Sequence, residues 1–351
     1  MVNLPTAHAR YYQSGYILLR TAMAVRFSFV PTSLITGSIT MSLLGGLPEF
    51  RHYPSAEKVD SWIDSVWDLG AKTKCPARRI VREGHPSQAH ITHMHGFGYL
   101  RFAPAGMDPF YACWQPALNG PAPLLVHTPG YGSEMSMHPD LAAQGFNVLH
   151  VNPMGYATPD GYDESKRRGQ ENWPVLRDTV ETGAREGYRI WLAQCVMAIR
   201  WAWKQKTVLA NRVSFFGSSQ GGGCSLILGS LFKDHGARCV AADVPFLTNF
   251  PSAKGQAGAY AMIHDGLNEM PDVARGWHAI GFIDTLSHAR RLTMPVLLTA
   301  AGDDTTCTPG SIESLFARLP STRSYTFLQG LPHGYTEPFI PLALGWFRLY
   351  A

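Results

Sequence analysis

The sequence predicts an α/β protein with a mostly parallel central sheet, helices on both faces of that sheet and an inserted cap segment. From about residue 95 onward, short apolar runs bounded by glycine and proline alternate with stretches in which apolar residues recur every three to four positions. The short runs are typical of strands buried on both faces, and the periodic stretches are typical of helices that bury one side. Because a strand–helix–strand unit brings its second strand back parallel to the first, the alternation favours a parallel sheet between two layers of helices.

The individual elements follow from these two patterns. Strands are expected in six apolar runs, at residues 123–128, 146–151, 212–217, 238–244, 295–301 and 324–329. Helical periodicity is clearest at residues 190–203, 226–232 and 341–350. Upstream we expect a helix from Lys58 to Leu69 and two leading antiparallel strands at Tyr99–Pro104 and Phe110–Pro116. Residues 246–290 interrupt the alternation with proline, glycine and polar residues, and this segment is expected to form a cap over the sheet edge.

Composition agrees with one globular α/β domain over residues 48–351. The chain of 351 residues is 45% hydrophobic and 16% charged, which suffices for a sizeable buried core. A formal net charge of +4 without a basic stripe argues against nucleic acid or an anionic membrane as the main partner. The six cysteines include no Cys-x-x-Cys pair, and they are interpreted as buried apolar residues or free thiols, with one or two disulfides left open.

Residues 1–47 are interpreted as an N-terminal extension that is disordered or serves as a weak signal or anchor segment. Residues 27–47 carry no charge, but Pro31, Gly37 and several serines and threonines interrupt any apolar helix. A start codon at Met23 or Met41 is a further hypothesis. A cytoplasmic protein is therefore favoured, with secretion and membrane anchoring as the alternatives.

The strongest chemical signal is the segment Gly217-Ser218-Ser219-Gln220-Gly221, which matches the pattern G-x-S-x-G. It follows the expected strand at 212–217 and precedes a glycine-rich helix start. A strand that turns directly into a helix strains the central residue, and the flanking positions must be glycine because a Cβ atom there would clash. The alternative is a glycine–serine loop that closes an ordinary strand–helix unit. The context favours Ser219 as a nucleophile whose hydroxyl projects above the sheet.

A serine hydroxyl is a weak nucleophile near neutral pH, so a base and an orienting acid are expected as well. When a serine lies on such a turn, the acid and then the histidine follow it along the chain. His333 lies in a loop between the last expected strand and the last helix, and Asp303 and Asp304 follow the preceding strand. Neighbouring side chains diverge, so only one of these two carboxylates can face His333; we favour Asp304.

Two backbone N–H groups are candidates for binding an oxyanion. That of Gln220 directly follows the nucleophile at a helix N-terminus, where the helix dipole favours negative charge. That of Tyr131 lies in the turn Gly130-Tyr131-Gly132 after the strand at 123–128. The alternative for the second candidate is a simple glycine turn.

From about residue 120 to its end, the sequence resembles the α/β-hydrolase fold, and within it the acetyl xylan esterase and cephalosporin C deacetylase family. Four segments carry the resemblance: the glycine-rich elbow at 217–223, the strand end Ala242-Asp243-Val244-Pro245-Phe246-Leu247, the acid turn Asp304-Thr305-Thr306-Cys307, and the loop Pro129-Gly130-Tyr131. The resemblance implies a serine esterase, in which Asp304 is the acid and the tyrosine N–H is one oxyanion donor. It also implies a small ester substrate, with deacetylation of sugars as one form, and a homo-oligomer.

The sequence departs from the family pattern in two places. The family carries Arg-Gly-Gln after its second strand, where this chain has Met154-Gly155-Tyr156. The family histidine is followed by glutamate, whereas His333 is followed by Gly334.

Other chemistries are less well supported. His90, His93 and His95 could provide a zinc pair, but no nearby cysteine or carboxylate completes a ligand set, so no metal is expected. No nucleotide-binding glycine motif follows a strand, so no cofactor is expected. Two alternatives to an ester hydrolase remain open: a serine peptidase or other acyl-bond hydrolase, and a non-catalytic hydrolase-like protein that binds a ligand.

Overall fold

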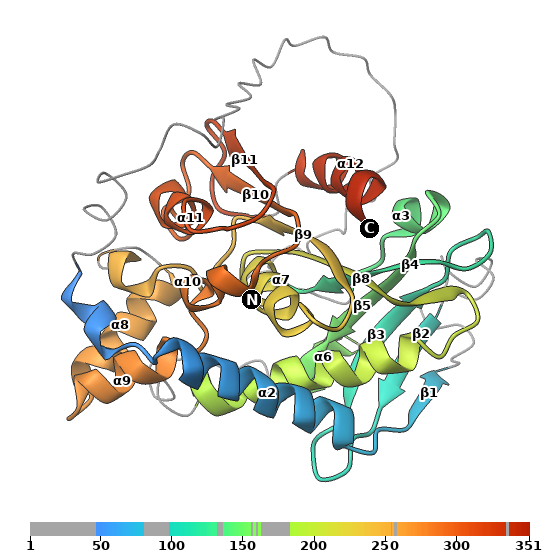
Figure 1. Cartoon of the computed structure of the whole chain (residues 1–351), viewed down its shortest axis with the longest axis horizontal. Helices are drawn as coiled ribbons and strands as arrows, with labels where there is room; N and C mark the ends of the chain where they lie inside the picture. The colour runs from blue at the N-terminus through green and yellow to red at the C-terminus, as the bar shows by residue number, and fades with distance from the viewer. Residues whose placement is uncertain are drawn as a thin grey trace, which may run out of the picture. The chain divides into compact units, whose positions relative to one another are not determined.

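A nine-stranded sheet organises the described part of the chain (Figure 1). The computed structural model describes residues 47–80, 98–131, 136–155, 157–158, 161–162, 183–253, 255, 258–334 and 337–351. The expectations for residues 1–46 and for His90, His93 and His95 lie outside these ranges. No helix within them is long and apolar enough to cross a membrane.

The strands of this sheet follow the predicted runs and add one, at residues 77–80, that the sequence did not reveal. In spatial order they are β1 (Ala77–Ile80), β2 (Gly98–Phe102), β3 (Phe110–Gln115), β5 (Asn147–Asn152), β4 (Ala122–Thr128), β8 (Val208–Ser218), β9 (Ala237–Asp243), β10 (Val296–Ala301) and β11 (Arg323–Leu328). The pairs from β1 to β5 are antiparallel. All pairs from β5 onward through β4, β8, β9, β10 and β11 are parallel, as the alternation of strands and helices predicts. Residues 157–158 and 161–162 form a separate two-stranded pair, β6 (Ala157–Thr158) and β7 (Gly161–Tyr162).

Helices cover both faces of this sheet because successive strand residues point to opposite sides. On β4, Leu124 and Val126 join the apolar cluster that contains α2 (Ala56–Lys72), α6 (Tyr188–Ala202) and α7 (Gln220–Leu231). Leu125, between them, joins a second cluster with α12 (Phe339–Tyr350). The two clusters are therefore separated by the sheet, and each supplies one layer of the hydrophobic core.

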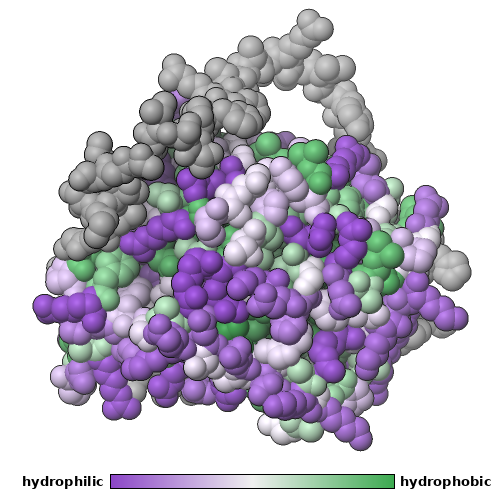
Figure 2. Space-filling model, viewed as in Figure 1, coloured by the Kyte–Doolittle hydropathy of each residue, from purple (hydrophilic) through white to green (hydrophobic). Residues whose placement is uncertain are grey.

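The helix α2 illustrates how one sequence pattern serves both core and surface. Its buried residues Val59, Ile63 and Val66 recur at helical spacing and face the core. Charged residues such as Asp64 and Asp68 occupy its exposed side. On the face drawn in Figure 2, hydrophilic side chains surround small apolar patches, as expected where such helices meet water.

The segment between β9 and β10, expected to be a cap, is mostly helical. It contains a short 3-10 turn (Phe250–Ala253), α8 (Ala259–Glu269), α9 (Val273–Ile280) and α10 (Thr285–His288). The buried carboxylate of Asp284 fastens this segment, because it accepts hydrogen bonds from the backbone N–H groups of Asn249 and Phe250, each at 3.0 Å, and from the Tyr53 hydroxyl at 2.8 Å. The role of the segment at residues 246–290 as a cap over the sheet edge stays a prediction.

All six cysteines are free, and five of them are buried. The interpretation as buried apolar residues or free thiols is confirmed, and the open alternative of one or two disulfides is wrong.

Three histidines form a cluster on the α12 side of the sheet. The Nδ1 atoms of His127 on β4 and His150 on β5 lie 2.8 Å apart, and the His138 ring contacts the His127 ring. His127 and His150 are buried; His138 is half-buried, but its Nε2 is shielded from solvent. Burial lowers the pKa of His150 to about 3 and of His138 to about 4, and it lowers the pKa of His127 well below the ordinary value. The fold therefore holds these rings neutral.

This cluster is expected to make the protein sensitive to acid. Histidines whose pKa is lower in the folded than in the unfolded state contribute full stability above about pH 6.5, and that contribution is lost as the pH falls toward the folded values. Between pH 7 and pH 5 the free energy of unfolding should fall by on the order of 4 kcal/mol. Urea unfolding curves at both pH values measure this change in the free energy of unfolding. His150→Gln should weaken the pH dependence by about 1–2 kcal/mol. If His150→Gln kept the full dependence, the cluster would not be its source.

Candidate active site

The turn between β8 and α7 has the strained geometry that the sequence predicts for it. Ser219, the residue between the two elements, has a φ of 55°, in the left-handed region that side chains with a Cβ atom rarely adopt. Its N–H donates to the carbonyl oxygen of Asp243 at 2.9 Å, and its own carbonyl accepts from the N–H of Phe246 at 2.9 Å. The end of β9 and the segment that follows it therefore hold the Ser219 backbone from both sides and offset the strain.

Two glycines of the turn are required by close backbone contacts. A Cβ atom on Gly221 would lie 2.1 Å from the carbonyl oxygen of Thr128, and one on Gly217 would lie 2.5 Å from the same oxygen. Because a backbone oxygen on a central strand cannot move aside, only glycine fits at these positions. The glycine pattern therefore reflects how tightly β4 approaches the turn.

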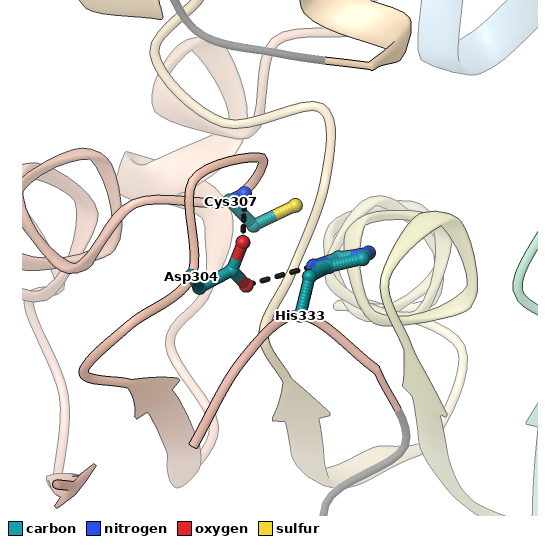
Figure 3. A group of neighbouring side chains, drawn as sticks. All are labelled: Asp304, Cys307 and His333. Atoms are coloured by element: carbon teal, nitrogen blue, oxygen red, sulfur yellow. Dashed lines mark hydrogen bonds and ion pairs between the residues drawn. The ribbon is translucent and has the colours of Figure 1, made fainter. Parts of the chain in front are cut away.

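Three side chains from distant parts of the sequence converge above this turn. The Oγ atom of Ser219 lies 3.0 Å from Nε2 of His333, in the loop after β11. Nδ1 of His333 lies 2.7 Å from Oδ2 of Asp304, in the loop after β10. Figure 3 shows the last two side chains facing each other. The structure thus brings together the serine, the histidine and the acid that the sequence analysis singled out.

The hydrogen-bond pattern determines which groups donate. A carboxylate can only accept, so Nδ1 of His333 carries the proton that points at Asp304. In the neutral ring Nε2 is then an acceptor, and the Ser219 hydroxyl donates to it. This is the arrangement that a general base needs before it removes a proton from the hydroxyl.

Asp304 and His333 differ in exposure. The Asp304 side chain is fully buried, whereas 28% of the His333 side chain is exposed. Oδ1 of Asp304 accepts hydrogen bonds from the backbone N–H groups of Thr306 at 2.8 Å and Cys307 at 2.7 Å. These bonds fix the carboxylate, so that Oδ2 faces His333 while the imidazole can reach a substrate.

The neighbouring Asp303 has a different environment. Its side chain is exposed, and its backbone N–H donates to the carbonyl of Leu331. The structure therefore brings Asp304, rather than Asp303, to the histidine.

The two candidate oxyanion donors lie close to the turn along the chain. Gln220 is the first residue of α7, so its N–H has no carbonyl partner one turn earlier within that helix. Both polar atoms of its buried side-chain amide also lack a hydrogen-bond partner among the described residues. Tyr131 follows β4 and is 61% exposed, and the next residue, Gly132, lies outside the described ranges. The donor role of each stays a prediction.

Two residues near the turn take roles that the sequence did not reveal. The Asp243 carboxylate accepts hydrogen bonds from the hydroxyls of Ser218 at 2.6 Å and Thr299 at 2.5 Å. The sequence analysis named Cys307 only as part of the turn that contains Asp304, yet its thiol is buried close to the side chains of Asp304 and His333. Burial raises the pKa of its thiol well above the ordinary value, and the nearby Asp304 and Asp243 carboxylates raise it further. In the sequence, only the spacing Asp304-x-x-Cys307 could have indicated that the Cys307 thiol lies near Asp304.

Comparison with known proteins agrees with the class that this architecture defines, the α/β-hydrolases. A structure of acetyl xylan esterase 1 from Thermoanaerobacterium sp. JW/SL YS485 matches with a TM-score of 0.66 and 20% identity, over 86% of this chain and 97% of that one. The acetyl xylan esterase from Paenibacillus sp. R4 matches with a TM-score of 0.68 and 19% identity, over 90% and 100% of the two chains. At these identities the likeness shows the fold.

The sequence itself identifies the family. The family model described as acetyl xylan esterase (AXE1) matches residues 41–347, so the chain belongs to the acetyl xylan esterase family. Membership makes it a serine-dependent carboxylic ester hydrolase with an α/β-hydrolase fold. No curated protein matches the sequence significantly. The resemblance stated from the motifs is thereby confirmed.

Proposed function

We propose that this chain hydrolyses acetyl and other short-chain carboxylic esters, with Ser219 as nucleophile, His333 as general base and Asp304 as the acid that orients the histidine. One observation carries the proposal: a continuous hydrogen-bonded path runs from the Ser219 hydroxyl through both ring nitrogens of His333 to the buried Asp304 carboxylate. A purely structural serine on a loop would need neither the strained turn nor the aligned imidazole.

The reaction proceeds in two halves through an acyl-enzyme. His333 takes the proton of Ser219 as the hydroxyl oxygen attacks the ester carbonyl, and Asp304 stabilises the imidazolium that forms. The same proton passes to the leaving alcohol, which departs as the acyl group stays on Ser219. Water then attacks the acyl-enzyme while His333 accepts its proton. His333 returns this proton to the Ser219 oxygen as the bond between that oxygen and the acyl carbon breaks, and the carboxylic acid leaves.

The backbone N–H groups of Gln220 and Tyr131 are proposed to bind the negatively charged oxygen of each tetrahedral intermediate. Such a donor contributes on the order of 3 kcal/mol, because it is already oriented before charge develops on the oxygen. The position of Gln220 at the start of α7 supports its part in this role, since the positive end of the helix dipole points toward the nucleophile.

The family supports acetyl esters as the substrate class. Both structural relatives described above are named as acetyl xylan esterases, so acetylated sugars are the first natural substrates to test. A small acyl group is also the simplest one for a covalent intermediate beside the buried groups Asp304 and Cys307.

A substrate panel tests the proposal. It comprises p-nitrophenyl acetate, butyrate and octanoate, an acetylated xylo-oligosaccharide, and an aminoacyl p-nitroanilide as the peptidase substrate. The expected result is that kcat/KM is highest for the acetate, at least about tenfold lower for the octanoate, and undetectable for the anilide. Faster cleavage of the anilide than of the esters would favour the peptidase alternative and overturn the proposal.

A fluorophosphonate probe separates an enzyme from a non-catalytic binding protein. The wild-type chain should be labelled on one residue, and Ser219→Ala should not be labelled. An unlabelled wild-type protein would contradict the proposed nucleophile.

A further inference from the structure

Asp304, Cys307 and His333 bring a carboxylate, a thiol and an imidazole, three kinds of metal ligand, close together. A ligand atom from each lies within 4.8 Å of the other two. Figure 3 shows the Cys307 sulfur on the same side of the acid turn as the His333 ring. The esterase mechanism uses the carboxylate and the imidazole, but it gives the thiol no role.

We propose that this group is an inhibitory binding site for Zn²⁺, with Cys307 Sγ, a ring nitrogen of His333 and a carboxylate oxygen of Asp304 as ligands. The inhibition rests on the catalytic role proposed above for His333, whereas the binding of the metal does not.

The ligand chemistry matches Zn²⁺. Thiolate sulfur, imidazole nitrogen and carboxylate oxygen are its usual protein ligands, at about 2.3, 2.0 and 2.1 Å from the metal. In a tetrahedral site such ligand atoms are about 3.5 Å apart. The ligand atoms of this group lie within 4.8 Å of one another, and Nδ1 of His333 lies 2.7 Å from Oδ2 of Asp304, so zinc binding requires shifts of about 1 Å that bring the thiol closer and separate the imidazole from the carboxylate. Three protein ligands leave the fourth position for water.

The charges also balance. Zinc binding releases the Cys307 thiol proton to solvent, and His333 binds as a neutral ring. The thiolate and the Asp304 carboxylate then neutralise the two positive charges of the metal. Because isolated charges are costly to bury, a neutral set of this kind suits a place where two of the three ligands are buried.

One turn of the chain already holds two of the three ligands, Asp304 and Cys307, next to each other. The N–H of Cys307 donates to Oδ1 of Asp304, which fixes both residues relative to each other and leaves Oδ2 for another partner. His333 is the ligand that moves, because it lies on a loop and its side chain is partly exposed. Its rotation exchanges the hydrogen bond with Asp304 for a shared metal ion.

Metal binding and catalysis exclude each other in this arrangement. A ring nitrogen bound to zinc has no free lone pair, and a rotated ring no longer lies 3.0 Å from the Ser219 hydroxyl. The metal therefore acts as a reversible inhibitor. Mg²⁺ should not replace it, because that hard cation prefers oxygen ligands.

Titration of the metal-free protein with Zn²⁺ in an esterase assay tests the inhibition. Each variant is compared with its own activity without metal. Cys307→Ser should raise the Zn²⁺ concentration for half-inhibition by at least about tenfold. Cys75→Ser, which changes a thiol outside the site, should match the wild type, and Mg²⁺ should not inhibit. Equal inhibition of Cys307→Ser and wild type, or no inhibition of the wild type, would overturn the proposal.

A second measurement does not depend on activity. Co²⁺ bound to a thiolate gives a charge-transfer absorption band, and Ser219→Ala retains all three proposed ligands. The band should appear when Co²⁺ is added to Ser219→Ala, should disappear on addition of Zn²⁺, and should be absent when Cys307→Ser is combined with Ser219→Ala. A missing band in Ser219→Ala would overturn the metal site, whereas full activity of Ser219→Ala would overturn the proposed nucleophile and leave the band unaffected.

Discussion

Ser219→Ala is expected to lower kcat for p-nitrophenyl acetate by about 10⁶-fold, close to the loss seen when a catalytic serine is removed from other serine hydrolases. Alanine retains the Cβ atom, so the strained turn and the backbone bonds to Asp243 and Phe246 should persist. The substitution therefore removes the proposed nucleophile with little effect on the fold. Steady-state kinetics and a thermal unfolding curve, measured on the same preparation, check both parts.

The neighbouring serine provides the matched control. Ser218→Ala removes a hydroxyl one residue away, which donates to the buried Asp243 carboxylate. This change should cost about 1–3 kcal/mol of stability, because it removes one donor from a buried charged group. Its kcat should stay within about tenfold of the wild type, since the hydroxyl is not in contact with His333. A Ser219→Ala enzyme that retains more than a hundredth of the wild-type kcat would rule out the proposed nucleophile.

Asp304→Asn is expected to lower kcat by about 10⁴-fold. The amide that replaces the carboxylate can donate to Nδ1 of His333, and the ring then carries its proton on Nε2. In that tautomer Nε2 cannot accept the proton of Ser219, although the three side chains remain in place. The pH dependence of the residual activity and the kcat value are the measurements.

Asp303→Asn is the control for the acid. Its carboxylate is exposed, and its backbone bond to Leu331 does not involve the side chain, so kcat should change less than about twofold. Should Asp303→Asn lose as much activity as Asp304→Asn, the assignment of the acid would be wrong.

The sequence predicts most of the fold because its strands and helices have distinct periods. β4, β5, β9, β10 and β11 differ from the expected runs by one residue at either end. β1 was missed, because its sequence Ala-Arg-Arg-Ile has no apolar run. The backbone pairing with β2, which the sequence does not show, holds these residues as a strand. The start of α7 was predicted from the turn motif, although the three glycines at residues 221–223 weaken its helical pattern, and the structure confirms a helix that begins at Gln220.

The candidate site also contains features that the sequence predicts and features that only the structure shows. Local residue preferences do not distinguish Asp303 from Asp304. In the structure, the backbone N–H groups of Thr306 and Cys307 bind the Asp304 carboxylate and hold it toward His333. The hydroxyl partners of Asp243 could not be foreseen either, because one of them, Thr299, lies 56 residues away on the neighbouring strand. Homo-oligomerisation and cellular location stay predictions.

By itself, the sequence determined the alternation of strands and helices, the glycine-rich turn that carries Ser219, and the order of serine, acid and histidine along the chain. These features depend on consecutive residues, whose steric limits and periodicity are local. Only the tertiary structure decided which side chains meet, since Ser219 and His333 are 114 residues apart and Asp304 and His333 are 29 apart. The register of the parallel strands and the packing of the loops at their ends bring these groups, and the thiol of Cys307 with them, to one place.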